Sequence, residues 1–91
     1  MRICIDFDDT IFARNGKIIF GAKEIINKWY EKNQITIFTN RPDYHYHTVK
    51  GILDLAKIKY HRIICGKPSY DLFIDDKAIG FNGWKELNDF V

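Results

Sequence analysis

An α/β fold with helices packed on a mostly parallel sheet is predicted by two features of the sequence. Short apolar runs typical of strands alternate with segments whose apolar residues recur at helical spacing. The strand-like runs are apolar at consecutive positions, as in strands covered on both faces, so helices are expected on both sides of the sheet. With 91 residues the chain has room for one domain, spanning 1–91.

The N-terminal part predicts a strand, a hairpin and a helix. The strand is expected at Ile3–Ile5, directly before Asp6. Asn15-Gly16 lies between β-forming residues and is a strong turn signal, so a small hairpin should follow the strand. A helix is expected at 21–33, where one apolar stripe contains Ala22, Ile25, Ile26, Trp29 and Tyr30.

The remaining chain continues the alternation. Strands are expected at 35–39, 62–65 and 72–74, with a short fifth at 78–81. A second helix should begin near Pro42, because a missing N–H costs nothing at a first helical position, and a last helical turn is expected at 84–90. Ligands bind outside the carboxyl ends of parallel strands. Polar residues end the expected strands and should meet at that edge: Asp6, Thr39, Lys67, Asp75 and Asp76.

Composition excludes several classes of protein. Lys and Arg total 14 and Asp and Glu total 12, so the formal charge of +2 gives no electrostatic reason to expect nucleic-acid binding. Cys4 and Cys65 are too few for a disulfide framework, and a reduced, cytoplasmic chain is expected. Neither a signal peptide nor a membrane span is expected, because no apolar run approaches the roughly 20 residues of a span.

The segment 6–10, Asp-Phe-Asp-Asp-Thr, is the richest in chemistry. Three carboxylates within four residues repel one another unless a cation or proton lies among them. Asp6 and Asp8 are two apart and can reach one cation, and Mg²⁺ suits such hard oxygen ligands. Asp75 and Asp76 would form the other half of the metal site. Taken alone, each acidic segment equally fits a solvated turn.

Two further segments suit phosphate binding. Lys67 lies between Gly66 and Pro68, and an ammonium near the strand ends would balance phosphate charge. Residues 39–41, Thr-Asn-Arg, precede a helix N-terminus, where a hydroxyl and free N–H groups form a phosphate cradle. The same three residues also suit an ordinary helix cap.

Together these segments resemble the four motifs of the haloacid dehalogenase (HAD) superfamily of phosphohydrolases. In order, the motifs are segment 6–10, Thr39, Lys67 and Asp75-Asp76, and they span most of the chain. The resemblance implies a Rossmann-like three-layer fold whose hairpin after the first strand is the family's flap. The chain is most similar to small members that lack a cap domain.

The resemblance also implies a role for each matching residue. Asp6 corresponds to the nucleophile that forms an aspartyl-phosphate, and Asp8 to the general acid and base. Thr39 and Lys67 correspond to the groups that bind the transferred phosphoryl. Mg²⁺ would be held by Asp6, Asp8 and Asp75, with Thr10 and Asp76 supporting the site.

No cap domain fits between the motifs. About ten residues separate Thr10 from the first expected helix, enough for a hairpin only, and one helix and one strand separate Thr39 from Lys67. An open site suits a phosphate on a large molecule, or an oligomer in which a neighbouring subunit forms the lid. Sugar phosphates are the first substrate class expected, from the resemblance, and nucleic-acid ends the second. Asn40 and Arg41 are expected to contact the substrate.

A non-catalytic binding or regulatory module, HAD-like or receiver-like, is the alternative. A receiver domain also gathers acids, a Thr and a Lys at strand ends, but its phosphorylated Asp follows the third strand. Here Asp6 and Asp8 follow the first strand, and Lys67 precedes the last acidic pair. This order favours a Mg²⁺-dependent phosphomonoester hydrolase.

Overall fold

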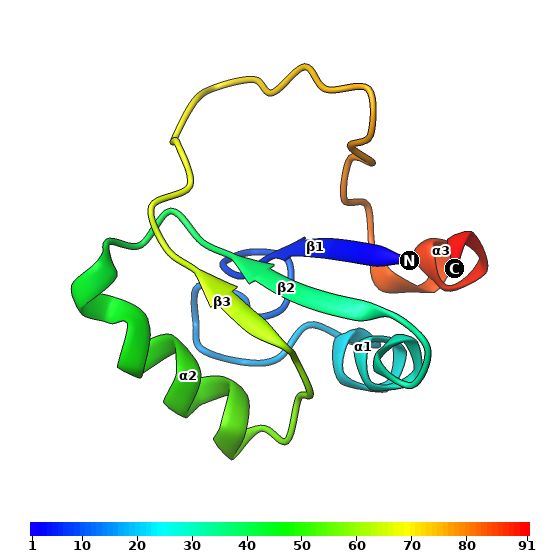
Figure 1. The fold of residues 1–91 in the computed structure, drawn as a ribbon, viewed down its shortest axis with the longest axis horizontal. Coiled ribbons are helices and arrows are strands. Elements are labelled where there is room, and N and C mark those ends of the chain that lie inside the picture. The colour runs from blue at the N-terminus through cyan, green and yellow to red at the C-terminus, as the bar shows by residue number, and fades with distance from the viewer.

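A three-stranded parallel sheet organises the computed structural model, which describes residues 1–91. The strands are β1 (Arg2–Asp6), β2 (Gln34–Phe38) and β3 (Arg62–Ile64), in the order β1-β2-β3. Ile5 of β1 pairs with Ile37 of β2, which pairs with Ile63 of β3. All three carboxyl ends therefore meet at one edge, as expected for the candidate site (Figure 1).

The helices follow the predicted order. The α-helices are α1 (Ala22–Tyr30), α2 (Tyr46–Leu55) and α3 (Trp84–Leu87), and the 3₁₀ helices are η1 (Asp43–His45) and η2 (Asn88–Phe90). Pro42 directly precedes η1, which continues into α2, so the predicted start of this helix is confirmed. No helix is long and apolar enough to cross a membrane.

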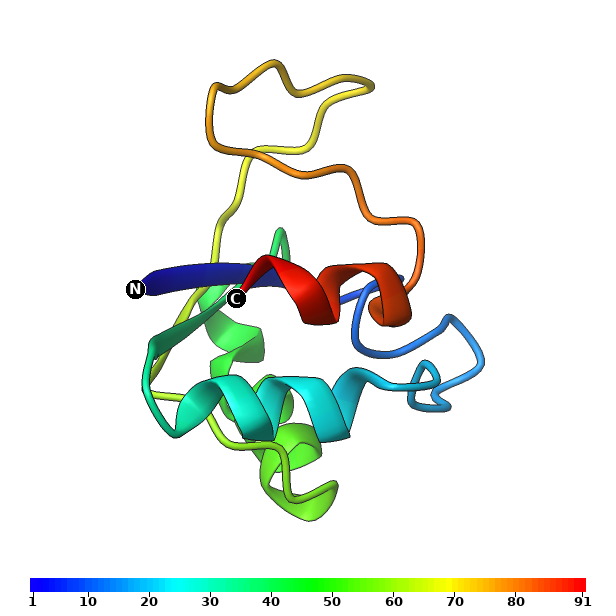
Figure 2. The same cartoon turned by 90° about the vertical axis from the view of Figure 1, so that its right-hand side faces the viewer.

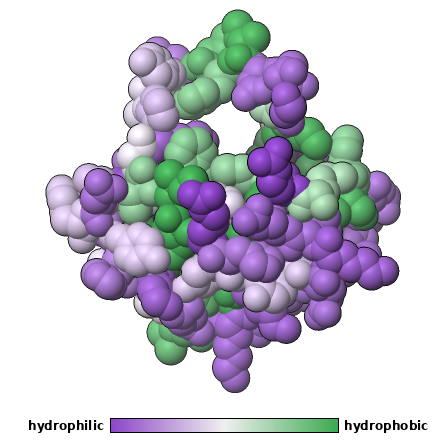
Figure 3. All heavy atoms as spheres, viewed as in Figure 1, coloured by the Kyte–Doolittle hydropathy of each residue, from purple (hydrophilic) through white to green (hydrophobic).

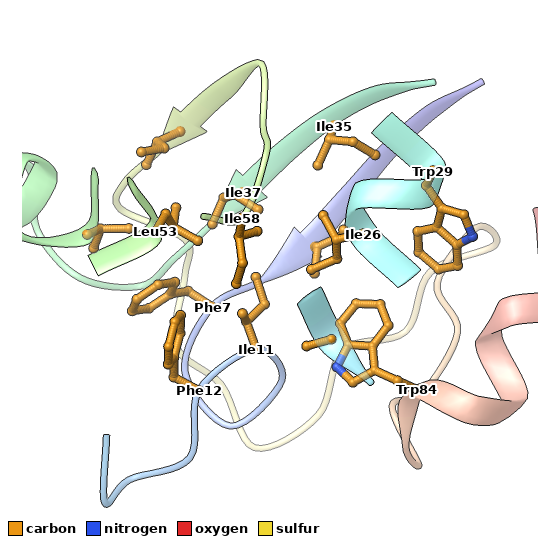
Figure 4. Close-up of a cluster of buried hydrophobic side chains, with 14 residues drawn as sticks. Phe7, Ile11, Phe12, Ile26, Trp29, Ile35, Ile37, Leu53, Ile58 and Trp84 are labelled. Carbon is orange, nitrogen blue, oxygen red and sulfur yellow. The ribbon is translucent and has the colours of Figure 1, made fainter. Parts of the chain in front are cut away.

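One hydrophobic core lies between the sheet and the helices α1 and α2 (Figure 4). Its strand residues are Ile5, Ile35, Ile37 and Ile63, and its helical residues include Ile26, Trp29, Val49 and Leu53. Phe7 and Phe12, from the segment after β1, pack against each other with ring centroids 5.4 Å apart and ring planes tilted by 45°. The loop that follows β1 is thus anchored in the core.

The expectation of helices on both faces of the sheet is wrong for this structure. Burial alternates along β2, where Ile35 and Ile37 are buried and Thr36 and Phe38 are only partly so. On β1, Cys4 is exposed although its neighbours are apolar. The sheet therefore has one packed face and one open face, a two-layer arrangement.

The predicted hairpin is reduced to a turn closed by one bridge. Phe12 and Ile18 form a single antiparallel bridge, and the Ala13 N–H donates to the Lys17 carbonyl at 2.8 Å. Gly16 has a φ of +83°, which explains the glycine at this turn.

The predicted strands at 72–74 and 78–81 are absent. Residues 68–80 are all exposed and form no backbone–backbone hydrogen bond. They make an arch that leaves β3, swings away from the body and returns to α3 (Figures 1 and 2). An apolar run becomes a strand only where its backbone finds a ladder partner, and this segment has none.

The arch ends at a buried anchor. Trp84 of α3 packs against Trp29 of α1, with ring centroids 5.7 Å apart. Gly21, at a φ of +87°, allows this close approach, because a Cβ there would lie 3.1 Å from the Trp84 Cβ. The predicted last helical turn is therefore confirmed, and it closes the core beside α1.

Candidate functional site

The site lies beyond the carboxyl ends of β1 and β2. Three backbone hydrogen bonds extend the pairing of β2 and β3 past their formal ends. Thr39 N–H donates to the Ile64 carbonyl at 3.0 Å, Gly66 N–H to the Arg41 carbonyl at 2.9 Å, and Lys67 N–H to the Thr39 carbonyl at 2.8 Å. These bonds fix Lys67 and Arg41 next to the loop that carries the acids.

Asp6 lies between a cation and a hydroxyl. Lys67 Nζ contacts Asp6 Oδ1 at 3.3 Å, and Thr10 Oγ1 donates to Asp6 Oδ2 at 3.3 Å. Charge-assisted bonds are usually about 2.7–2.9 Å, so both contacts are loose. The Lys67 and Asp6 side chains are 24% and 36% exposed, which leaves this carboxylate accessible from solvent.

Asp8 is held more tightly, by a bidentate pair with Arg41. Arg41 Nε donates to Oδ2 at 3.0 Å and Nη2 to Oδ1 at 2.9 Å. The hydrogen bonds that Arg41 donates to Asp8 raise the pKa of Arg41, which therefore stays charged. Arg41 Cζ also lies 5.2 Å from the ring centroid of the buried Phe7, within cation–π range.

Thr39 closes the turn after β2. It is fully buried, and its Oγ1 accepts a hydrogen bond from the Arg41 N–H at 3.2 Å. As it lies here, the hydroxyl caps the backbone and does not face solvent. Asn40, expected to contact the substrate, is exposed beside it.

The third acid of segment 6–10 has its own partner. Asp9 lies 3.5 Å from Arg14, and both side chains are more than half exposed. Each of the three carboxylates thus faces a different cation: Lys67, Arg41 and Arg14. The repulsion expected among the acids is relieved by the chain itself.

The second acidic pair does not reach the site. Asp75 and Asp76 lie on the exposed arch, where Asp75 accepts from the Lys77 N–H at 2.8 Å and Asp76 lies 3.4 Å from Lys77 Nζ. The Lys77 N–H bond lowers the pKa of Asp75. The predicted convergence of Asp6, Asp8 and Asp75 is absent, because the fourth strand that would carry Asp75 does not form.

The side chains as they lie do not fit a Mg²⁺ site. No group of three or more His, Cys, Asp or Glu side chains is arranged to hold a metal ion. Both oxygens of Asp8 are occupied by Arg41, and the two of Asp6 by Lys67 and Thr10. The positive charge at this edge is supplied by side chains.

The arch meets the site at one aromatic ring. Lys67 Nζ lies 5.1 Å from the Phe73 centroid and 5.8 Å from that of Phe38. Figure 3 shows an opening between the arch and the body of the molecule. Sequence reasoning missed the contacts of Arg41 with the ring of Phe7 and of Lys67 with the ring of Phe73. The partners in the first pair are far apart in the sequence, and no local pattern indicates either contact.

Comparison with known proteins identifies no relative. No family model, no curated protein and no solved structure matches the chain. Chemically, the site presents a partly exposed carboxylate with a nearby ammonium, hydroxyl and guanidinium. Such a set suits a ligand that carries a phosphate group.

Proposed function

We propose that this chain is a phosphomonoester hydrolase that works through an aspartyl-phosphate. The observation that carries the proposal is the position of Asp6, directly at the end of β1 and between Lys67 Nζ and Thr10 Oγ1. A carboxylate in that position is oriented, accessible and next to a cation. These are the requirements of a nucleophile toward phosphorus.

The reaction would run in two displacements. An Asp6 oxygen attacks phosphorus, the bond to the ester oxygen breaks, and the leaving oxygen takes a proton from Asp8, which must be released from Arg41 and protonated at this step. Water then attacks the aspartyl-phosphate and gives up a proton to Asp8. Inorganic phosphate leaves and the Asp6 carboxylate is restored. Asp8 acts as acid in the first step and as base in the second.

Charge is the main obstacle, because carboxylate and phosphate are both negative. Lys67 and Arg41 form ion pairs with the proposed nucleophile and the proposed general acid, and their positive charges would reduce that repulsion. Mg²⁺, which the family resemblance implies, supplies further positive charge in such hydrolases. A requirement for it in this chain stays a prediction from the sequence, since a site that includes Asp75 needs the arch to lie elsewhere.

The test is release of inorganic phosphate from phosphate esters, with two matched variants. Asp6→Asn should abolish turnover, because an amide is not a nucleophile. Asp9→Asn should retain it: Asp9 pairs only with the exposed Arg14, and Asn tolerates its φ of +64°. Loss of turnover in both variants, or in neither, would contradict the role of Asp6.

The substrate class proposed is a sugar phosphate, followed by a nucleic-acid end. The acids and cations of the site are partly exposed, which agrees with the open site that the sequence predicts. Binding energy must then come from parts of the substrate that extend along the surface, or from a neighbouring subunit acting as lid.

A binding module without turnover is the second candidate. The observation that favours it is the complete pairing of the three acids with Lys67, Arg41 and Arg14, together with the burial of Thr39. Under this alternative, inorganic phosphate binds to the wild type in calorimetry, but no ester is hydrolysed with or without divalent metal. Asp6→Asn would then bind phosphate at least as tightly.

A further inference from the structure

The contact between Arg41 and Asp8 joins two loops that are far apart in the sequence. Asp8 belongs to the loop after β1, and Arg41 to the loop after β2, 33 positions later. It is the one ion pair in the structure with two hydrogen bonds in parallel. Its side chains are 28% and 42% exposed, so solvent and solutes can reach it.

The backbone of Arg41 is fixed, and its guanidinium, whose one hydrogen-bond partner is Asp8, has N–H donors to spare. Its N–H donates to Thr39 Oγ1, and its carbonyl accepts from the Gly66 N–H. A guanidinium has five N–H donors, and Asp8 uses two of them. A partly exposed ion pair exchanges readily with an anion of the same shape, because solvent already screens it.

We propose that Arg41 determines specificity by exchanging Asp8 for a second anionic group on a phosphorylated ligand. This inference rests on the proposed function, since it takes Asp6 as the place where the phosphoryl group binds. Lys67 Nζ lies 3.3 Å from Asp6 Oδ1 and would contact the phosphoryl group bound at Asp6. Arg41 pairs with Asp8 and not with Asp6. It can therefore bind another anionic group of the ligand, a carboxylate or a second phosphate.

The exchange would link ligand binding to the state of Asp8. In the free protein, both Asp8 oxygens are occupied by Arg41. A ligand anion that takes the guanidinium releases both oxygens while the substrate is bound. A phosphate ester with no second charge leaves the pair in place. The preferred substrates are therefore phosphate monoesters that carry a further acidic group.

Four phosphate esters of equal core size test the exchange: phenyl phosphate, 4-carbamoylphenyl phosphate, 4-carboxyphenyl phosphate and 1,4-phenylene bisphosphate. Dissociation constants are measured by calorimetry on the wild type, at low temperature and with short mixing times. The carboxy and bisphosphate probes should bind about tenfold more tightly than the carbamoyl probe, as a bidentate charged contact allows. Whichever of the two binds more tightly shows which anion Arg41 prefers.

Two variants separate exchange from a purely structural ion pair. Arg41→Gln should reduce the preference for the carboxy over the carbamoyl probe to within about twofold. Asp8→Asn should increase it, because the guanidinium no longer has a charged competitor. A structural pair predicts that both variants weaken binding alike. Parallel losses in the two variants, or an unchanged preference in Arg41→Gln, would overturn the exchange.

The proposed function and the exchange fail differently. If no probe is hydrolysed but the binding preference follows Arg41, hydrolysis is wrong and the exchange stands. If the probes are hydrolysed with equal affinity whatever their second group, hydrolysis stands and the exchange is wrong. Should Arg41→Gln fail to fold, as judged by circular dichroism, Asp8→Asn alone decides, because exchange predicts a stronger preference for the carboxy over the carbamoyl probe, whereas a structural pair predicts weaker binding of both.

Discussion

The indole Nε1 of Trp84 donates a hydrogen bond of 2.7 Å to the backbone carbonyl of Thr10. The two residues are 74 positions apart, and the bond ties the C-terminal helix α3 to the loop that carries Asp6 and Asp8. Trp84 is 2% exposed. The C-terminal segment is therefore a buttress of the candidate site, although it contributes no polar side chain to it.

Two substitutions of Trp84 should lower the free energy of unfolding by different amounts. Trp84→Phe keeps most of the packing and loses the hydrogen bond, at a cost of about 1 kcal/mol. Trp84→Ala also leaves a cavity, at a cost of about 3–5 kcal/mol, a large share of the stability of a small domain. Urea unfolding measures both. Phe90→Ala, at a position 61% exposed, is the control and should change stability little. Equal effects in all three would show that α3 does not anchor the loop.

Replacing Asp8 should matter most for poor leaving groups. Asp8→Asn removes the proton donor, so hydrolysis of an alkyl phosphate should fall by about 10²–10⁴. A nitrophenyl phosphate leaves without a proton and should be much less affected. The ratio of kcat/KM for the two esters, in wild type and variant, gives the answer. An equal loss for both esters would mean that Asp8 does not act as a general acid.

The metal dependence of phosphate release should show whether Mg²⁺ or the side chains of Lys67 and Arg41 supply the positive charge that hydrolysis needs. If Mg²⁺ is required, EDTA abolishes phosphate release, added Mg²⁺ restores it, and Mg²⁺ raises the melting temperature. Asp75→Asn should then weaken the dependence, whereas Asp71→Asn on the same exposed arch should not. Full activity in EDTA would instead assign the charge to Lys67 and Arg41.

The hydroxyl of Tyr60 should lose its proton at a higher pH than that of an ordinary tyrosine. Burial, followed by its hydrogen bond to Asp54 at 2.7 Å, raises the pKa of Tyr60. Its neutral form is thus favoured by folding, so the stabilisation is complete below the unfolded pKa of about 10 and is lost as pH rises through the folded value. Tyrosinate absorbance of the wild type minus that of Tyr60→Phe gives the Tyr60 curve. A midpoint at or below 10 would contradict the raised value.

Small aryl phosphates should be poor substrates. If the site is open, as the sequence predicts, it cannot surround them, so KM should be high, whereas phosphorylated sugars would extend along Asn40 and Arg41 and should give higher kcat/KM. A panel assayed by phosphate release checks this order. If the smallest esters are hydrolysed as fast as any other, a lid from a neighbouring subunit becomes the better explanation. Sedimentation would then show an oligomer.

Local patterns predicted the elements that are stabilised by nearby contacts. The apolar stripe of 21–33 gave α1, and the signal at Pro42 gave the start of η1 and α2. The position of Lys67 beside Asp6 followed from the rule that parallel strands end at one edge. The two helices were predicted from patterns within a few turns, whereas the meeting of Lys67 and Asp6, 61 positions apart, followed from the parallel order of the strands.

The errors concern contacts that depend on distant partners. Leu72–Ile74 is as apolar as β1, but a strand also needs a neighbouring backbone, which no local pattern reports. Cys4 lies in a strand that was expected to be covered on both faces, but its face of the sheet is open. The pairing of Arg41 with Asp8 spans 33 positions and occupies the oxygens that the predicted metal site would use. Sequence alone shows the acids and the bases, but not which base each acid meets.

Because the arch connects α3 to the rest of the chain, the packing of α3 against the core can be treated as the binding of a tethered ligand. Residues 68–80 form no backbone–backbone hydrogen bond. The C-terminal segment is therefore held to the body by the chain connection and by its docked contacts, which are the packing and hydrogen bond of Trp84, the packing of Leu87 and the bond from Lys28 to Asn88. Its docking is an intramolecular association at an effective concentration set by the tether, in the millimolar range for short flexible linkers. Lengthening the arch would dilute α3 only slowly, whereas cutting it would turn one chain into a two-component complex. The order of the loop that bears Asp6 and Asp8 would then depend on how much of the free C-terminal peptide is present.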